Sequence, residues 1–306
     1  CQLALAQDYY PPIVNYSSKE YKINKLNDDG SEIKMNPENF AVVQDQRGVM
    51  YFGNSNGILE FDGQDWDFIE VSIGNFVKSL AIDSNGVIYV GTNNDFGYLE
   101  SDEHHHLIYH SMIDMLDEES QYFSEIVSIY STKNEVFFQA QEAVYIYNIE
   151  FNSITSVFAD VSFHTSYLTN GVFYVRERGK GILKWENDTF KLLKGTEYLF
   201  GTFEGTGYGC FGIHQSLYSD TLILITQEQG MFKWWNDQLI PILDPDNNYL
   251  NPLKLFHSIR LSDGNFALST NRKGIYIIDE QGKLKKQINM ATGMRTNDVK
   301  SMFEDR

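Results

Sequence analysis

The chain of 306 residues is 42% hydrophobic and 14% aromatic, and its 42 acidic and 24 basic side chains give a formal net charge of −18. This length and apolar content suffice for a large buried core. The acidic balance excludes nucleic acid and anionic membranes as partners of this segment, because phosphate groups require a basic surface. No apolar run reaches the ~18 residues of a membrane-spanning helix.

The first residues form a short apolar stretch without an initiator methionine. Residues 1–7 read CQLALAQ and end in a small-residue Ala-x-Ala pattern, residues 4–6. This pattern is typical of the end of a secretory signal peptide, so we expect residues 1–7 to be the remnant of one. The alternatives are a lipoprotein whose mature chain starts at Cys1, or a cytosolic start. The signal-peptide interpretation predicts a periplasmic protein.

Residues 39–71 have the pattern of four short antiparallel strands. A strand that includes Val42 leads to a polar turn at 45–48, and a second strand covers 49–52. Two more strands, at 58–61 and 66–71, follow turns rich in Gly, Asn and Asp. Gly adopts positive φ at no steric cost in such turns, and Asp-Gly between strands indicates a hairpin. Four strands in one short segment make one blade of a β-propeller.

The same pattern recurs with a period of about 40 residues. Asp83 and Gly86 follow Asp45 and Gly48 by 38 residues (from 45 to 83 and from 48 to 86). Four later copies keep the pattern more loosely, with the residue before the second strand at Glu135, Gly171, Thr221 and Gly264. The sequence therefore predicts an all-β fold, a propeller of six recognisable repeats at residues 8–306. Residues 297–305 look like the first strand of a seventh, which predicts a truncated piece of a longer ectodomain with seven blades in the parent.

The cores of these copies, D-x-x-G-V-x-Y-x-G followed by N-G-I-L-x-F-D-G, resemble the two-component regulator propeller repeat. The resemblance covers about residues 12–305. It implies a periplasmic sensor segment of a hybrid two-component or helix-turn-helix transmembrane regulator of Bacteroidetes-type bacteria, often a glycan sensor and a homodimer. The family offers no ligand-contact motif that can be carried over residue by residue.

Two turns between second and third strands are rich in basic residues. One holds Arg176, Arg178 and Lys180, and the equivalent turn two repeats later holds Arg272 and Lys273. These turns lie on one face of a propeller, where ligands usually bind, and Arg pairs with carboxylate or sulfate groups. They predict a site for an anionic small molecule or oligosaccharide. The alternative is a set of solvated loops paired with neighbouring Asp and Glu.

Two further side chains are candidates for ligand contact. Trp235 points to the opposite strand face from Trp234, which together with Trp66 and Trp185 we expect to pack between blades. Trp235 is therefore freer to stack on a sugar. His257 lies shortly before the second strand that we predict after Gly264, so it falls near the start of the innermost strand of the same blade. There its side chain can face the central channel.

The sequence contains no signature of catalysis, of a metal site or of a cofactor. It lacks G-x-S-x-G, C-x-x-C and a phosphate-binding loop. Residues 104–106 and His110 are histidines, yet three consecutive residues of a strand cannot point the same way, so we expect a polar exposed insertion followed by one or two helical turns at 110–119. We therefore predict a non-catalytic sensor; the alternative is a propeller-fold lyase or glycosidase.

Overall fold

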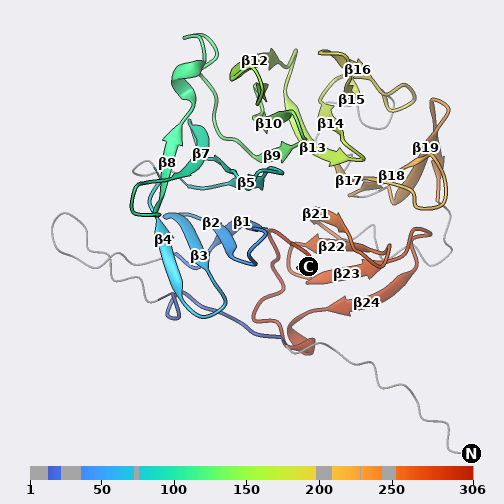
Figure 1. Cartoon of the computed structure of the whole chain (residues 1–306). Coiled ribbons are helices and arrows are strands. Elements are labelled where there is room, and N and C mark those ends of the chain that lie inside the picture. Colours follow the sequence, from blue (N-terminus) through green and yellow to red (C-terminus); the bar gives the residue numbers. More distant parts are fainter. Residues whose placement is uncertain are drawn as a thin grey trace, which may run out of the picture.

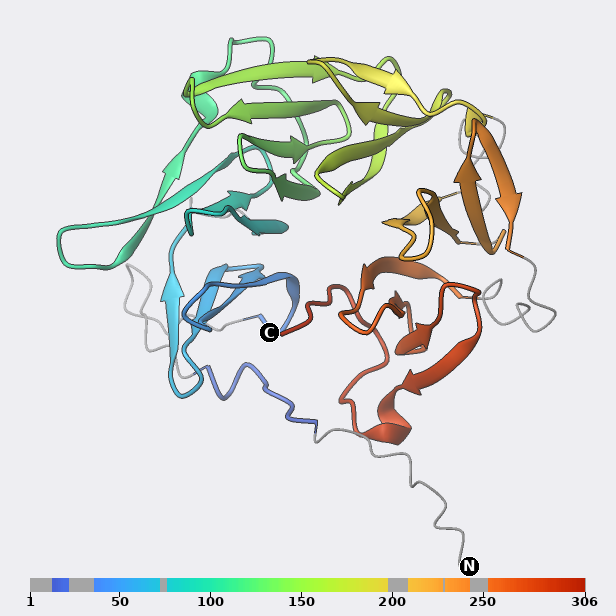
Figure 2. The same ribbon diagram turned by 45° about the vertical axis from the view of Figure 1, so that its right-hand side comes forward.

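The computed structural model describes residues 13–21, 36–71, 76–197, 209–227, 229–242 and 253–305. Within these residues, six four-stranded antiparallel sheets surround a central channel (Figures 1 and 2). In each sheet the strands pair in chain order, so each consecutive group of four strands is one blade. The predicted β-propeller and its six repeats are confirmed. Residues 1–7, for which we expect a signal-peptide remnant, lie outside the described residues.

The strands of the first three blades are β1 (Asn39–Gln44), β2 (Met50–Asn54), β3 (Gly57–Phe61), β4 (Trp66–Ile69); β5 (Ser79–Ile82), β6 (Ile88–Gly91), β7 (Phe96–Ser101), β8 (Leu107–Ser111); and β9 (Ser128–Ser131), β10 (Glu135–Gln139), β11 (Ala143–Asn148), β12 (Ser153–Phe158). Those of the last three are β13 (Phe163–Thr169), β14 (Val172–Glu177), β15 (Gly181–Trp185), β16 (Phe190–Leu192); β17 (Cys210–Gln215), β18 (Leu222–Thr226), β19 (Met231–Trp235), β20 (Gln238–Pro241); and β21 (Leu255–Arg260), β22 (Phe266–Thr270), β23 (Ile275–Ile278), β24 (Leu284–Ile288).

The repeated aspartate holds the turn between the first and second strands. The Oδ1 atom of Asp45 accepts hydrogen bonds from the backbone amides of Arg47 (2.8 Å) and Val49 (3.0 Å). Asp83 accepts the equivalent bonds from Asn85 and Val87, both at 2.9 Å. An aspartate that bonds the amides two and four residues ahead fixes the chain reversal, and the glycine between them has φ near +88° in both copies (Gly48 +89°, Gly86 +87°). These bonds explain why D-x-x-G recurs at this turn in the first two blades.

Side chains between neighbouring blades form the core. Blades 2 and 3 meet through Phe96, Phe138 and Tyr145, which are fully buried, with ring centroids of Phe96 and Phe138 4.5 Å apart. Blades 3 and 4 meet through a stacked pair, Phe137 and Phe173, at 4.4 Å. Offset or edge-on aromatic pairs stabilise such interfaces beyond the area that they bury. Each blade therefore buries its apolar side chains against its neighbours.

Of the three tryptophans expected to pack between blades, Trp185 and Trp234 contact a neighbouring blade, and Trp185 lies 6.2 Å from Phe137 of blade 3. Trp66 instead packs within blade 1 and against Tyr16 and Tyr21 of the N-terminal segment. Trp66 stacks on Phe61 at 4.5 Å, and Trp185 contacts Phe190 edge-on at 5.0 Å. Trp234 donates from Nε1 to the carbonyl oxygen of Lys194 at 2.7 Å, which joins blade 5 to the end of blade 4. Aromatic side chains of the outer strands thus stabilise the outer edge of the propeller.

The expected helix at 110–119 is shorter than predicted. His110 lies in β8, which pairs with β7, and a 3₁₀ helix, η1, covers only Ile113–Met115. A second 3₁₀ helix, η3, covers Met290–Thr292. The residues around His110 continue the hairpin ladder, so strand pairing overrides the weak helical pattern. Within the described residues no helix is long and apolar enough to cross a membrane.

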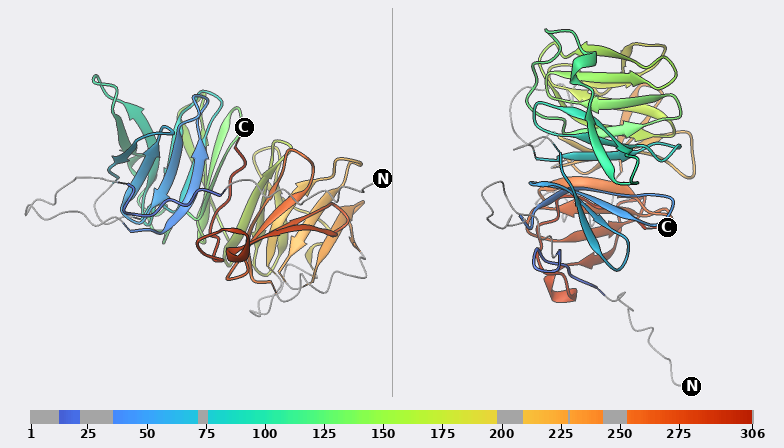
Figure 3. Two further views of the ribbon diagram at one scale, coloured as in Figure 1. Left: turned by 90° about the horizontal axis from the view of Figure 1, so that it is seen from below. Right: turned by 60° about the vertical axis from the view of Figure 1, so that its left-hand side comes forward.

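The chain's two described ends meet at the junction between blades 1 and 6, which lie side by side in Figures 1 and 3. Residues 297–305 form no strand. Even so, the Val299 amide donates to the Thr270 carbonyl oxygen at 3.3 Å, as the Val77 amide donates to Asn54 at 3.1 Å where blade 2 follows blade 1. The segment therefore lies where a next innermost strand would begin, and it points toward the channel (Figure 2).

Candidate ligand site

The antiparallel order of the blades divides the loops between two faces of the ring. Turns between second and third strands lie beside the starts of the innermost strands: the amides of Val77, Ile126 and Phe163 bond the carbonyl oxygens of Asn54, Thr92 and Gln141. We call this side the front face. Turns between first and second strands, and between third and fourth strands, lie on the back face.

The structure places the two predicted basic turns on the front face, in blades 4 and 6. Arg178 and Lys180 follow β14, and Arg272 and Lys273 follow β22. Lys180 is already paired, since its Nζ lies 2.7 Å from Asp160 Oδ2 and 2.9 Å from Glu177 Oε2. For Lys180 the structure therefore supports the alternative of a locally paired loop.

Arg176 is not a loop residue. It lies in β14 and is only 6% exposed, and burial lowers the pKa of its guanidinium. It lies close to His164, whose pKa burial and the charges of Arg176 and Arg178 lower to about 4. A neutral imidazole beside a buried guanidinium avoids like-charge repulsion.

Trp235 is separated from the basic turns. It ends β19 and pairs with Gln238 across the turn between third and fourth strands, which places it on the back face. The side chain is 52% exposed, as expected for a tryptophan that points away from the blade interface. The seven predicted residues therefore do not form one cluster.

The six innermost strands line the central channel, and the described residues of these strands border two cavities in it. The front cavity, about 290 Å³, lies between β1, β5, β9 and β21 and is bordered by residues 300–302. The back cavity, about 460 Å³, lies between β9, β13, β17 and β21. Tyr130 and His257 line both. The expectation that His257 faces the channel thus fits its position in the structure.

Two lysines line the front cavity. Lys78 Nζ lies over the ring of Phe40, 4.2 Å from its centroid, and Lys300 Nζ lies 4.5 Å from the centroid of Phe256. An ammonium group over an aromatic face is held by the ring quadrupole. Both lysines also have longer-range carboxylate partners, Glu125 at 3.5 Å and Asp298 at 3.6 Å.

The back cavity is lined by His214 and Arg260. Ser258 Oγ donates to the Phe211 carbonyl oxygen at 2.7 Å, so the 2.8 Å contact between Ser258 Oγ and His214 Nε2 requires the histidine to donate. Burial lowers the pKa of His214 to about 3, which agrees with a neutral ring. Arg260 lies over Phe266, 5.0 Å from the centroid, and 4.0 Å from Glu280.

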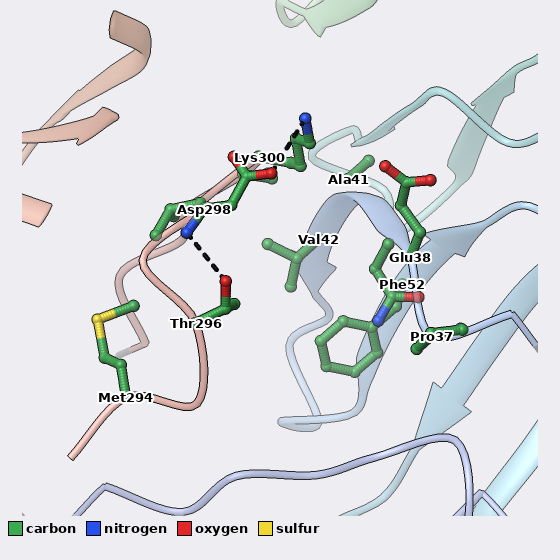
Figure 4. Close-up of a pocket in the computed structure, with 12 residues that line it drawn as sticks. Pro37, Glu38, Ala41, Val42, Phe52, Met294, Thr296, Asp298 and Lys300 are labelled. Atoms are coloured by element: carbon green, nitrogen blue, oxygen red, sulfur yellow. Dashed lines mark hydrogen bonds and ion pairs between the residues drawn. The ribbon is translucent and has the colours of Figure 1, made fainter. Parts of the chain in front are cut away.

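A third space, a slot of about 540 Å³, separates blades 1 and 6. Figure 4 shows Val42, Phe52 and Pro37 on one side and Met294 and Thr296 on the other. The ion pair of Lys300 with Asp298 lies on the same segment as Met294 and Thr296 (Figure 4). Lys300 lines both the slot and the front cavity.

Sequence reasoning missed Lys78, Lys300, His214 and Arg260. Their signal is positional: Lys78 directly precedes an innermost strand, and His214 and Arg260 lie near the ends of two others. A search for charged residues beside each predicted innermost strand, rather than in the turns, would have found Lys78 and Arg260. Within the described residues no group of three or more His, Cys, Asp and Glu side chains is placed to hold a metal ion, and His104–His106 lie in an exposed hairpin turn.

Comparison with known proteins agrees with this architecture. Residues 72–94 match the family profile described as "Two component regulator propeller", so the chain carries this repeat. No curated protein matches the chain. Among solved structures, it resembles the extracellular domains of two hybrid two component systems from B. thetaiotaomicron, with TM-scores of 0.64 and 0.60 and 14% identity in each case.

These likenesses cover 88% of this chain but only 36% and 38% of the two ectodomains, so the chain spans about a third of their length. Virginiamycin B lyase from Staphylococcus aureus is also similar, with a TM-score of 0.58, 11% identity, and coverage of 83% of this chain and 86% of the lyase. At these identities the structural likeness shows the propeller fold.

Proposed function

We propose that this propeller is the periplasmic, ligand-binding input part of a transmembrane signalling protein, and that the ligand binds in the central channel. The observation that carries the proposal is the pair of channel cavities, which are lined by His214, His257 and Arg260 of the innermost strands and by Lys78 and Lys300. A rigid ring with convergent polar groups in a cavity is the usual form of a small-molecule site. The propeller repeat at residues 72–94 supports the signalling context.

The proposed ligand class is a glycan, as the resemblance to two-component regulator propellers implies. Three aromatic side chains, Phe40, Phe256 and Tyr130, line the front cavity and give it apolar surface that a sugar ring can contact. The mechanism is differential binding: a ligand that prefers one arrangement of the propeller and the parts that follow it shifts the population toward that arrangement. In a dimeric parent this shift would be transmitted across the membrane.

The catalytic alternative is a lyase or glycosidase. A glycosidase needs two carboxyl groups across the scissile bond, and among the described residues that line the two cavities there is no Asp or Glu. A lyase does not need this pair, and one of the structural neighbours is a lyase. Incubation with uronate-containing polysaccharides distinguishes the two cases, because elimination creates an unsaturated product with ultraviolet absorbance. We expect no such product.

The proposal is tested by a thermal-shift screen of the 306-residue protein against neutral and acidic oligosaccharides. A ligand at 100 times its dissociation constant stabilises the folded state by about 2.7 kcal/mol and raises the melting temperature by several degrees. A saturable increase, lost when channel residues are changed, supports the proposed sensor. Absence of a shift with every sugar would reject the glycan, and cleavage of any of them would reject the non-catalytic role.

A further inference from the structure

The front cavity is unusual in its charge. The chain has 42 acidic and 24 basic side chains, so a lining drawn at random would contain more carboxylates than cations. The described residues that line the front cavity instead include Lys78, Lys300 and His257, and neither Asp nor Glu. The lining of the front cavity therefore carries net positive charge, from Lys78 and Lys300, in an otherwise acidic protein, and such a local field attracts anions.

The two ammonium groups retain capacity for a ligand. Their carboxylate partners, Glu125 and Asp298, do not line the front cavity. The N···O separations of 3.5 and 3.6 Å are longer than the ~2.7–2.9 Å of a charge-assisted hydrogen bond. An ammonium group has three donors, so each lysine can hold its outer carboxylate and still donate into the cavity.

His257 adds an independent observation. Its Nδ1 atom is buried and has no hydrogen-bond partner among the described residues. Burial lowers the pKa of His257 to about 4, so the ring is neutral at pH 7 and one nitrogen can donate while the other accepts. A buried polar atom without a partner is unfavourable unless a ligand or water satisfies it.

We propose that the front cavity is an anion subsite, in which Lys78, Lys300 and His257 bind the carboxylate or sulfate group of an acidic sugar. This inference rests on the proposed sensor function and specifies the chemistry of its ligand. A cavity of about 290 Å³ is at the lower end of ligand pockets, so it takes one charged sugar unit rather than an internal stretch of polymer. The subsite favours the charged sugar, because a neutral sugar can accept hydrogen bonds from the two ammonium groups but carries no negative charge to pair with them.

The test uses side-chain imidazole NMR on the 306-residue protein, titrated with galacturonic acid, galactose or sodium sulfate at constant ionic strength. The imidazole signals of His257, assigned with His257→Gln, are expected to shift saturably with galacturonic acid and with sulfate, and not with galactose. In the double variant Lys78→Met, Lys300→Met the affinity for galacturonic acid is expected to fall at least tenfold. Lys191→Met removes an exposed lysine that pairs with Glu186, and is expected to change the affinity less than twofold.

Several outcomes would overturn the subsite. Equal shifts with galactose, shifts that follow sodium chloride alone, or unchanged affinity in the double variant would each do so. If the double variant does not fold, two measurements still test the subsite. They are the affinity of Lys300→Met alone for galacturonic acid, and the comparison of galacturonic acid with galactose on the unmodified protein. Galacturonic acid binding at His257 without any oligosaccharide effect on signalling in cells would leave the subsite in place and reject the sensor function.

Discussion

Asn15 and Arg295 are joined by a hydrogen bond of 3.0 Å from the Arg295 amide to Asn15 Oδ1, although 280 residues separate them. Asn15 Nδ2 also donates to the Gly293 carbonyl oxygen at 3.1 Å. Next to Asn15, the ring of Tyr16 lies 5.3 Å from Phe61 and 5.6 Å from Trp66, on blade 1. The N-terminal segment thus bridges the chain after blade 6 to the outer strands of blade 1.

We predict that Asn15→Ala weakens this bridge. Two hydrogen bonds are lost at a solvent-exposed position, so the free energy of unfolding should fall by about 1 kcal/mol. Urea denaturation measures the loss. Asn134→Ala, at an exposed turn of blade 3, is the matched control and should change stability by less than ~0.5 kcal/mol. Equal effects of the two substitutions would show that the bridge does not contribute.

Asp83, the buried copy of the repeated aspartate, should contribute more to stability than an exposed aspartate in the corresponding turn of blade 6. Asp83 is 6% exposed and bonds two backbone amides, with Tyr89 Oη 3.5 Å away. Asp83→Ala leaves these donors unsatisfied and is expected to destabilise the protein by about 2–3 kcal/mol. In the corresponding turn of blade 6, Leu261 takes the place of the repeated aspartate, and the exposed Asp263 accepts a backbone hydrogen bond from the Asn265 amide. Asp263→Ala should lower stability by ~1 kcal/mol or less. Thermal melts of both variants give the comparison, and a reversed order would contradict the role assigned to burial.

Replacing Lys180 should lower stability, whereas replacing Arg178 should not, although both residues belong to the same basic turn. Lys180 pairs with Glu177, which is 1% exposed, so Lys180→Met leaves a buried carboxylate without its cation. Because Lys180 itself is partly exposed, we expect a loss of only ~1–2 kcal/mol. Arg178 is exposed, and Arg178→Ala should leave the melting temperature unchanged. An unchanged melting temperature for Lys180→Met would show that this pair does not stabilise the loop.

Stability should decrease as the pH falls below neutrality. Burial lowers the pKa of His164 to about 4, of His214 to about 3 and of His257 to about 4, whereas an unfolded histidine titrates near 6.5. Between about pH 6.5 and pH 4 the unfolded chain therefore binds more protons, so the free energy of unfolding rises with pH in this window. Each such histidine contributes at most ~1.4 kcal/mol per pH unit.

This pH dependence is checked by melting temperatures from pH 7 to pH 4.5. His164→Phe should make the curve less steep, because one group that takes up a proton on unfolding is removed. A melting temperature that is constant from pH 6.5 to pH 4.5 would contradict the neutral, buried state of these three rings.

The sequence alone predicts the blades, but it does not predict which residues form the candidate ligand site. The spacing of Asp45 and Asp83 placed the second strands correctly, because local hydrogen bonds within a turn depend on residues next to each other in the chain. The helix expected after His110 was wrong for most of its length, since pairing with Tyr98 in β7 extends the strand instead. Whether residues of distant repeats meet depends on how the ring closes, which no short pattern encodes.

Lys78 and Lys300 illustrate that limit. They are separated by most of the chain, and neither belongs to a turn with a basic pattern. They line the same cavity because one precedes the innermost strand of blade 2 and the other follows blade 6 into the channel. His257 could be predicted because its place at an innermost strand follows from its own repeat alone.

The slot and the front cavity share Lys300, and this makes binding at the two places thermodynamically linked. Anything that enters the slot and holds the Lys300 side chain toward or away from the channel changes the affinity of the front cavity for an anion. By reciprocity, an anion in the cavity changes the affinity of the slot for its occupant by the same factor. At the junction between blades 1 and 6, an occupant of the slot and an anion in the cavity would therefore act on the same side chain, Lys300.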